Sequence, residues 1–130
     1  MIKFERDETI KEKIKDIVET LNLDHIDLNR LSCVRSKGSG AKRTIARCYA
    51  LSKIWQLSLN LQAHYIIEII SEKYDRLSES EKTKVLMHEL LHIPFSFGGG
   101  FKHHDYVTNK RIDELYEKYK KIKNFLKFRL

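Results

Sequence analysis

Residues 78–94 read SESEKTKVLMHELLHIP, and this stretch predicts a single capped helix. Ser78 suits the N-cap position, and Glu81 lies three residues later, where a capping box needs a carboxylate. The helix should run to about His92, because Pro94 disfavours helical geometry at the residue before it. The fold is therefore expected to be organised around a helix whose last turn carries two histidines.

Two further helices are expected, one before and one after this stretch. The first should span residues 7–21, and the last should start near His104 or Asp105, after a loop that contains Gly98-Gly99-Gly100. In both, apolar residues recur at helical spacing with charged residues between them. The expected buried positions are Ile10, Ile14, Ile17, Val18 and Leu21 in the first helix, and Ile112, Leu115, Tyr116, Tyr119, Ile122 and Leu126 in the last.

About four strands are expected between the first helix and residue 78. Residues 31–35 and 44–49 flank Gly38-Ser39-Gly40 and predict a hairpin. Residues 55–61 alternate apolar with polar, which predicts a strand with Trp55 in the core. Residues 65–70 are bulky and β-branched, as in a further strand. The fold class is therefore α+β, with an N-terminal helix, a mainly antiparallel sheet, an active-site helix and a C-terminal helix.

Length and composition predict one folded domain over residues 1–130. Hydrophobic residues make up 42% and charged residues 33%, which is typical of a folded protein rather than a disordered one. No apolar run reaches the ~18 residues of a membrane helix. The charged first eight residues lack the apolar centre of a secretion signal, so we expect a cytoplasmic protein without a membrane partner.

The two cysteines, Cys33 and Cys48, lie far from any Cys-x-x-Cys spacing. Two small core residues are the simplest interpretation. A disulfide between neighbouring strands stays open at this point, although a reducing compartment disfavours it.

His88 and His92 are four residues apart, so they project from one face of the predicted helix about one turn apart. Two imidazoles in that position can bind one zinc ion at ~2.0–2.1 Å each. Glu89 lies beside them, where a carboxylate could accept a proton from zinc-activated water. Apolar neighbours predict partial burial, which favours a metal site over two surface histidines.

A catalytic zinc ion usually takes three protein ligands, so one more ligand should follow His92. His103, His104 and Asp105 come together after the glycine-rich loop, which can reverse the direction of the chain. Glu114, on the last predicted helix, is a further candidate. The residues alone leave the choice among these four open.

The stretch HELLHIP at residues 88–94, followed by Gly99, Phe101-Lys102 and His104-Asp105, resembles the small zinc metallopeptidases of archaea and phages, which are zincin-like proteins. Residues 50–55 and 64–68 resemble them as well. The resemblance implies a minimal zincin fold, in which the edge strand of the sheet borders the cleft and the active-site helix lies behind it. SprT-like proteases, which act on DNA-bound proteins, are the most similar in architecture.

The resemblance also assigns roles. It implies zinc-dependent peptide hydrolysis, with His104 as the third ligand and His103 as the alternative. Asp105 would then hold a histidine or cap the next helix. Tyr106 could donate a hydrogen bond to the oxyanion, although a packing role is the simpler interpretation.

The charge of the chain suggests a second kind of partner. The formal net charge is +7, and the C-terminal stretch is basic and amphipathic. It could contact nucleic acid, or it could be the solvated face of the last helix. Its cations are Lys118, Lys120, Lys121, Lys123, Lys127 and Arg129.

Three functions remain after the sequence analysis. They are a zinc metallopeptidase acting on peptides or proteins, a nucleic-acid-associated zinc-binding protein, and a zinc hydrolase of a non-peptide bond. Glu89 favours catalysis, because a structural zinc site has no use for a carboxylate base.

Overall fold

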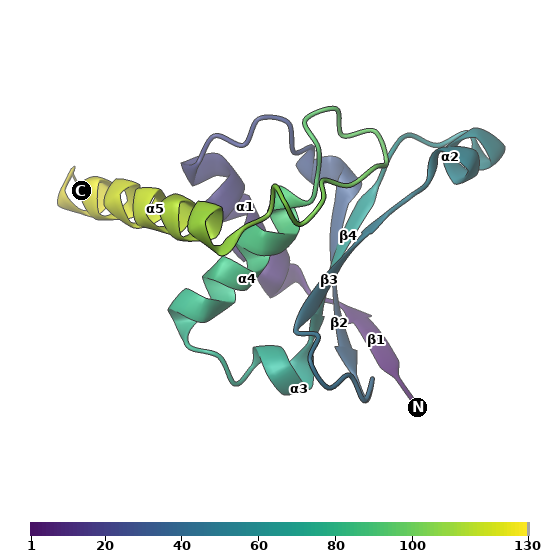
Figure 1. Ribbon diagram of the computed structural model, residues 1–130, viewed down its shortest axis with the longest axis horizontal. Helices are drawn as coiled ribbons and strands as arrows, with labels where there is room; N and C mark the ends of the chain where they lie inside the picture. The colour runs from purple at the N-terminus through teal and green to yellow at the C-terminus, as the bar shows by residue number, and fades with distance from the viewer. Residues whose placement is uncertain (130) are drawn as a thin grey trace.

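The computed structural model describes residues 1–129 and has helices lying against a four-stranded sheet, an α+β fold as predicted (Figure 1). The elements follow one another as β1 (Lys3–Arg6), α1 (Glu8–Thr20), a 3-10 turn (Leu28–Arg30), β2 (Leu31–Lys37), β3 (Ala46–Ala50), α2 (Lys53–Leu59), β4 (Tyr65–Ile70), α3 (Ser71–Tyr74), α4 (Glu79–Leu91) and α5 (Asn109–Arg129). Within residues 1–129, no helix combines the length and the apolar character that crossing a membrane requires.

The strand order is β1-β2-β4-β3, so the sheet is mixed. β1 with β2 and β4 with β3 pair antiparallel, whereas β2 with β4 pairs parallel. The expected hairpin between residues 31–35 and 44–49 is therefore wrong, because β4 lies between those two segments. β4 is almost entirely apolar and buried, and such a strand is stabilised most in the middle of a sheet.

The segment around Trp55 is a helix, not the strand that its alternation predicted. α2 is seven residues long and ends at Asn60, whose φ of 54° is left-handed. α2 lies in the connection between β3 and β4, where Leu57 and Leu59, and Leu61 just after the helix, are exposed to solvent. Trp55 is 58% exposed, so its expected place in the core is also wrong.

The core lies between the sheet and helices α1 and α4. α1 spans one residue less than predicted at each end, with the Asp7 carboxylate accepting from the Ile10 N–H at its N-cap. α4 begins with the predicted capping box of Ser78 and Glu81. The side chains that fill the space between helices and sheet include Ile14, Ile17, Leu86, Leu90, Tyr65, Ile67 and Ile69.

α5 begins at Asn109, later than the predicted start near His104 or Asp105. Residues 103–107 form turns instead, in which the amides of Tyr106 and Val107 donate to the His103 carbonyl. The Thr108 hydroxyl then accepts from the Arg111 N–H, as an N-cap side chain does.

Cys33 and Cys48 are free thiols. Both are in register with Ile67, one on each side of β4. They are therefore two strand spacings apart, about 9.5 Å, which is beyond the reach of a disulfide. Burial raises the pKa of each thiol to about 12, so both stay protonated.

Candidate metal centre

The last turn of α4 places His88 and His92 side by side. Their Nε2 atoms are 3.3 Å apart, and both rings are half-buried. Leu86, Met87 and Leu90 are fully buried on the opposite side of the helix and fix its rotation against the core. The same packing that holds α4 therefore points both imidazoles into one space.

The loop after α4 brings a third imidazole to the pair. The ring of His104 lies 4.9 Å from that of His92 and 5.9 Å from that of His88, measured between ring centroids. One nitrogen from each of the three rings lies within 4.8 Å of the others. The structure thus gathers His88, His92 and His104, the three residues that the sequence analysis favoured.

The hydroxyl of Tyr65, on β4, forms two hydrogen bonds to the glycine-rich loop after α4. The hydroxyl accepts from the Gly99 N–H at 2.9 Å and donates to the Gly100 carbonyl at 2.8 Å. Gly99 has a φ of +107°, and a Cβ there would lie 2.8 Å from the Leu51 carbonyl oxygen and 2.5 Å from Gln56 Nε2. The loop can therefore approach Tyr65 only with glycine at this position.

The three histidines fit a metal ion that prefers imidazole. A tetrahedral zinc ion with Zn–N bonds of ~2.0–2.1 Å separates two of its ligands by about 3.3 Å, which matches the distance between the two Nε2 atoms. His92 Nδ1 lies 2.8 Å from the Lys102 carbonyl oxygen, so it is the protonated nitrogen, and Nε2 keeps its lone pair for a metal. Burial, and then the nearby His92 and His104, lower the pKa of His88 and favour its neutral, metal-binding form.

Glu89 borders this centre on α4 and is 7% exposed. One of its carboxylate oxygens lies 3.9 Å from His88 Nε2. Burial raises the pKa of this carboxyl to about 7. A group with that pKa can both accept and return a proton near neutral pH, as a general base must.

The other predicted site residues lie outside the group of three. His103 is exposed and lines the cleft described next, while Asp105 is exposed in the turn. The Lys102 ammonium lies 3.8 Å and the Arg111 guanidinium 4.4 Å from the centre of the Tyr106 ring, so this tyrosine packs against two cations. Glu114 is exposed on α5, where it lines a surface groove of that helix.

A cleft of about 580 Å³ opens in front of the three histidines. Edge strand β3 forms one wall, and Phe101, Lys102 and His103 form another. The Ile70 N–H donates to the Ile45 carbonyl, and the Leu51 N–H donates to the His64 carbonyl. Hydrogen-bonded positions alternate along an antiparallel pair, so the backbone groups of every second residue from 45 to 51 face β4. The backbone groups of Ala46, Cys48 and Ala50 therefore point away from β4 and toward the open edge.

Two residues that position the site could not be recognised from the sequence. Tyr65 was expected only as part of a buried strand, and Gln56 as the polar side of another strand. Gln56 Nε2 donates to the carbonyls of Leu51 and Gly98 and so links α2 to the loop. Neither role has a local sequence signal, because each depends on a loop more than thirty residues away.

The chain matches a known protein family. No curated protein and no solved structure matches the chain significantly. A family model matches residues 2–127, which include every strand, helices α1 to α4, nearly all of α5 and the whole metal centre. The protein therefore belongs to the metallopeptidase family that is described as "Putative phage metallopeptidase".

Proposed function

We propose that this protein is a zinc-dependent metallopeptidase that hydrolyses peptide bonds, with Glu89 as the general base. The observation that carries the proposal is the combination, in one cleft, of three convergent imidazoles and a buried carboxyl group. Three protein ligands that leave a fourth position open are typical of catalytic rather than structural zinc.

His88, His92 and His104 would hold the metal. A zinc ion held there would supply Lewis acidity and a water whose pKa is lowered to about 7. The hydrogen bond between His92 and the Lys102 carbonyl orients one ligand and increases its basicity. Glu89 would take a proton from the attacking water and deliver it to the leaving amine, a role for which its raised pKa is suited.

The edge of β3 favours a peptide over a non-peptide substrate. An extended polypeptide can pair with the outward backbone groups of Ala46, Cys48 and Ala50, as in other peptide sites that add a strand to a sheet. This pairing would lay its backbone across the mouth of the centre, next to Glu89. The arrangement agrees with the zincin-like resemblance, in which an edge strand borders the cleft and a helix lies behind it.

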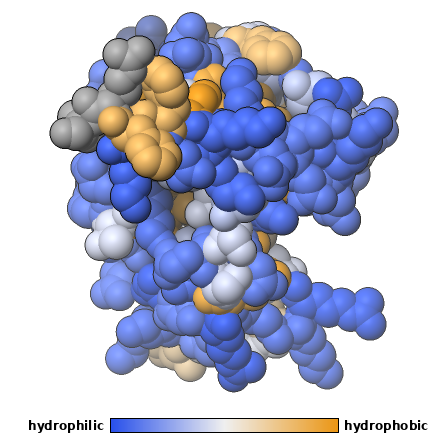
Figure 2. All heavy atoms as spheres, turned by 90° about the vertical axis from the view of Figure 1, so that its left-hand side faces the viewer, coloured by the Kyte–Doolittle hydropathy of each residue, from blue (hydrophilic) through white to orange (hydrophobic). Residues whose placement is uncertain are grey.

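A nucleic-acid contact is a second proposal, based on α5. This helix extends from the body of the molecule (Figure 1). The face of the molecule from which it extends is mostly hydrophilic (Figure 2). Lys120 and Lys123 pair with Glu117 and Asp16, whereas Lys118, Lys121 and Lys127 are exposed cations. The side chain of Arg129, also predicted as a contact, lies outside the described residues.

The test of the peptidase proposal is Glu89→Gln, with Glu114→Gln as a control that removes an exposed carboxylate from α5. Zinc content would be measured by elemental analysis, and cleavage by the appearance of new amino termini on an unfolded, alkylated protein. Glu89→Gln should keep about one zinc ion per chain and lose at least about a hundredfold in rate, because the amide cannot accept a proton. Glu114→Gln should change neither quantity, and a chelator should abolish cleavage by the wild type.

Zinc-dependent cleavage by Glu89→Gln at the wild-type rate would remove Glu89 from the mechanism. Wild-type protein that holds zinc on the three histidines and cuts no unfolded protein or peptide would contradict the peptidase proposal itself.

A further inference from the structure

The connection between β3 and β4 carries a large apolar surface. We call residues 51–64 the arm; it includes α2 and projects from the body on the side opposite the C-terminal end of α5 (Figure 1). All seven residues of α2 are at least partly exposed, and so short a helix is marginal in water without a partner. The exposed apolar side chains of the arm are Ile54 (75%), Trp55 (58%), Leu57 (84%), Leu59 (51%) and Leu61 (55%).

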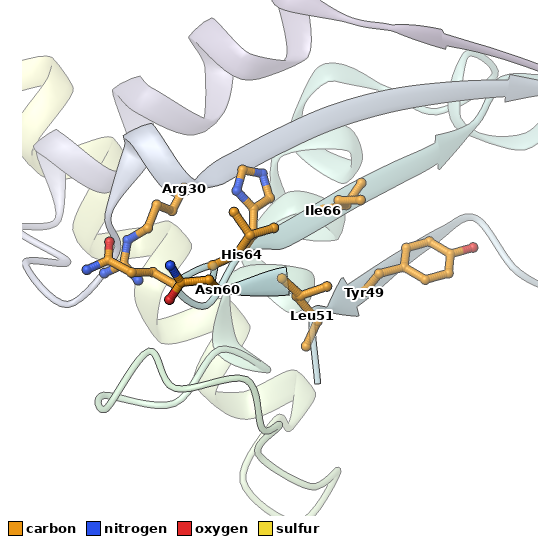
Figure 3. Close-up of a pocket in the computed structure, with 9 residues that line it drawn as sticks. Arg30, Tyr49, Leu51, Asn60, His64 and Ile66 are labelled. Carbon is orange, nitrogen blue, oxygen red and sulfur yellow. The ribbon is translucent and has the colours of Figure 1, made fainter. Parts of the chain in front are cut away.

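A pocket of about 620 Å³ lies where the two ends of the arm meet strands β3 and β4. Ala50, Leu51, Leu61 and Ile66 make its lining mainly apolar. Figure 3 shows Tyr49, Leu51 and Ile66 around one side of the pocket, and Arg30, Asn60 and His64 toward the other.

Tyr49 lines both the arm pocket and the metal cleft, so the two lie next to each other across the edge strand β3. Its hydroxyl donates to the buried carboxylate of Glu68 at 2.5 Å, which fixes the ring at the edge of the sheet. A polypeptide that extends along β3 would leave the cleft, pass Tyr49 and reach the pocket. Cys48 and Leu51 are three residues apart, about 10 Å in a strand, so three or four substrate residues would span the distance.

We propose that the exposed apolar surface of the arm, together with the arm pocket at its base, binds an apolar segment of the polypeptide substrate, three to five residues to one side of the bond that is cut. The inference rests on the proposed peptidase function and assigns its substrate class: unfolded chains that expose aliphatic or aromatic side chains. Lys53 is the only charged residue between positions 51 and 63, and Arg30, which lines the pocket, is paired with Asp27. The surface therefore selects apolar rather than charged side chains. The net charge of +7 disfavours a second copy of the chain as the occupant.

Trp55 is the only tryptophan of the chain and lies on the exposed surface of the arm, so its fluorescence reports on a peptide that covers the arm. The experiment uses zinc-loaded Glu89→Gln protein, which binds without cutting. Peptides of twelve residues would carry a Leu/Ile/Val block on the amino side of the central bond, on the carboxyl side, or on neither side. The peptide with the block on one of the two sides should bind at least about tenfold more tightly than the others and shift the Trp55 emission to shorter wavelength.

Substitutions in the arm should remove this preference. Leu57→Ser and Leu61→Gln change exposed side chains, so they should leave the fold intact and weaken binding of the preferred peptide about tenfold each. Phe128→Ser is the matched control, because Phe128 is 92% exposed on α5, at the far end of the molecule from the arm. It should change neither the affinity nor the emission.

The inference is overturned if all three peptides bind alike, if the Trp55 emission does not move, or if the arm variants bind as the control does. It is also overturned if sedimentation shows a dimer that Leu57→Ser dissociates, since the arm would then be an interface between copies. Failure of the peptidase proposal looks different: the preferred peptide binds and shifts Trp55, but wild-type protein with zinc does not cut it.

Discussion

His92 and Lys102 are hydrogen-bonded to each other twice. The Lys102 N–H donates to the His92 carbonyl oxygen at 2.8 Å, and His92 Nδ1 lies 2.8 Å from the Lys102 carbonyl oxygen. These bonds close the loop between His92 and Lys102, and Lys102 lies two residues before His104. The backbone between His92 and Lys102 therefore helps to set the position of His104, whose ring also lies 4.9 Å from that of His92.

The third metal ligand is the first prediction. His104→Ala should weaken zinc binding at fixed pH by more than about a hundredfold, since it removes a donor rather than an outer-shell partner. His103→Ala and Asp105→Ala should leave zinc affinity within a few fold, because neither side chain belongs to the group of three. Isothermal titration or competition with a chromogenic chelator measures all three. An empty site in His103→Ala or Asp105→Ala, with His104→Ala still filled, would contradict the assignment.

The second prediction concerns the hydroxyl of Tyr65. Tyr65→Phe removes both hydrogen bonds to the glycine loop, so zinc affinity should fall about tenfold, as it does when outer-shell partners are lost. Tyr74→Phe is the matched control. Tyr74 is equally buried, but within residues 1–129 its hydroxyl has no hydrogen-bond partner. Equal zinc affinity in the two variants would show that Tyr65 does not position the loop.

The third prediction is a pH dependence of stability at the start of α1. Burial alone would raise the pKa of Asp7, but hydrogen bonds from the Ile10 amide and from Arg35 outweigh it and hold the pKa below 3.8. A pKa depressed in the folded state stabilises the protein above the unfolded value and loses that effect as pH falls through the folded value. The stabilisation should therefore be complete above about pH 5, decline as the pH falls from there, and be lost only below the folded-state pKa of Asp7, which lies under 3.8.

Asp7→Asn isolates this effect, because asparagine also caps a helix but carries no charge toward Arg35. Its free energy of unfolding in urea should be about 1–2 kcal/mol lower than that of the wild type at pH 7. The two proteins should converge as the pH falls below 4. Asp24→Asn, at an exposed turn position, should follow the wild type throughout. A constant difference between Asp7→Asn and the wild type from pH 7 to pH 3 would be inconsistent with this explanation.

The fourth prediction tests the nucleic-acid proposal. Binding of the wild type to DNA or RNA should weaken steeply with salt, since phosphate contacts release counterions. Replacing Lys118, Lys121 and Lys127 with glutamine should reduce the slope of log K against log salt by about 2–3. The control with the same charge change replaces Lys3 on β1, Lys37 at the end of β2 and Lys42 in the connection between β2 and β3, all of them exposed. Identical slopes for both triple variants, or no binding at low salt, would remove α5 as a contact.

The parts of the fold that the sequence predicted correctly depend on local interactions. The capping box at Ser78 and Glu81 defines the start of α4 within four residues, and Pro94 limits its end. Because both histidines lie on that helix, their spacing on one face followed directly. His104 could be favoured only through the resemblance to known metallopeptidases, since its position depends on how the glycine loop meets Tyr65.

The errors concern contacts between distant segments. The glycines at residues 38–40 indicate a turn, but they do not show that β4 will insert between the strands on either side. The residues from Trp55 to Leu61 alternate with a period of two, yet a period identifies a strand only when one of its faces is buried. Here both faces of the segment are exposed, so nothing in the fold enforces the alternation.

The strand order also determines when the cleft can exist during synthesis. β3 enters the sheet only through β4, which follows it by fourteen residues, and α4 follows later still. A nascent chain that has reached residue 60 contains β2 and β3 but not β4, which lies between them in the sheet. β3 therefore has no strand to pair with at that stage. The wall that would receive substrate and the helix that would hold the metal are thus completed within the same short interval of translation. Before that interval a partly synthesised chain lacks the cleft that the proposed peptidase activity requires.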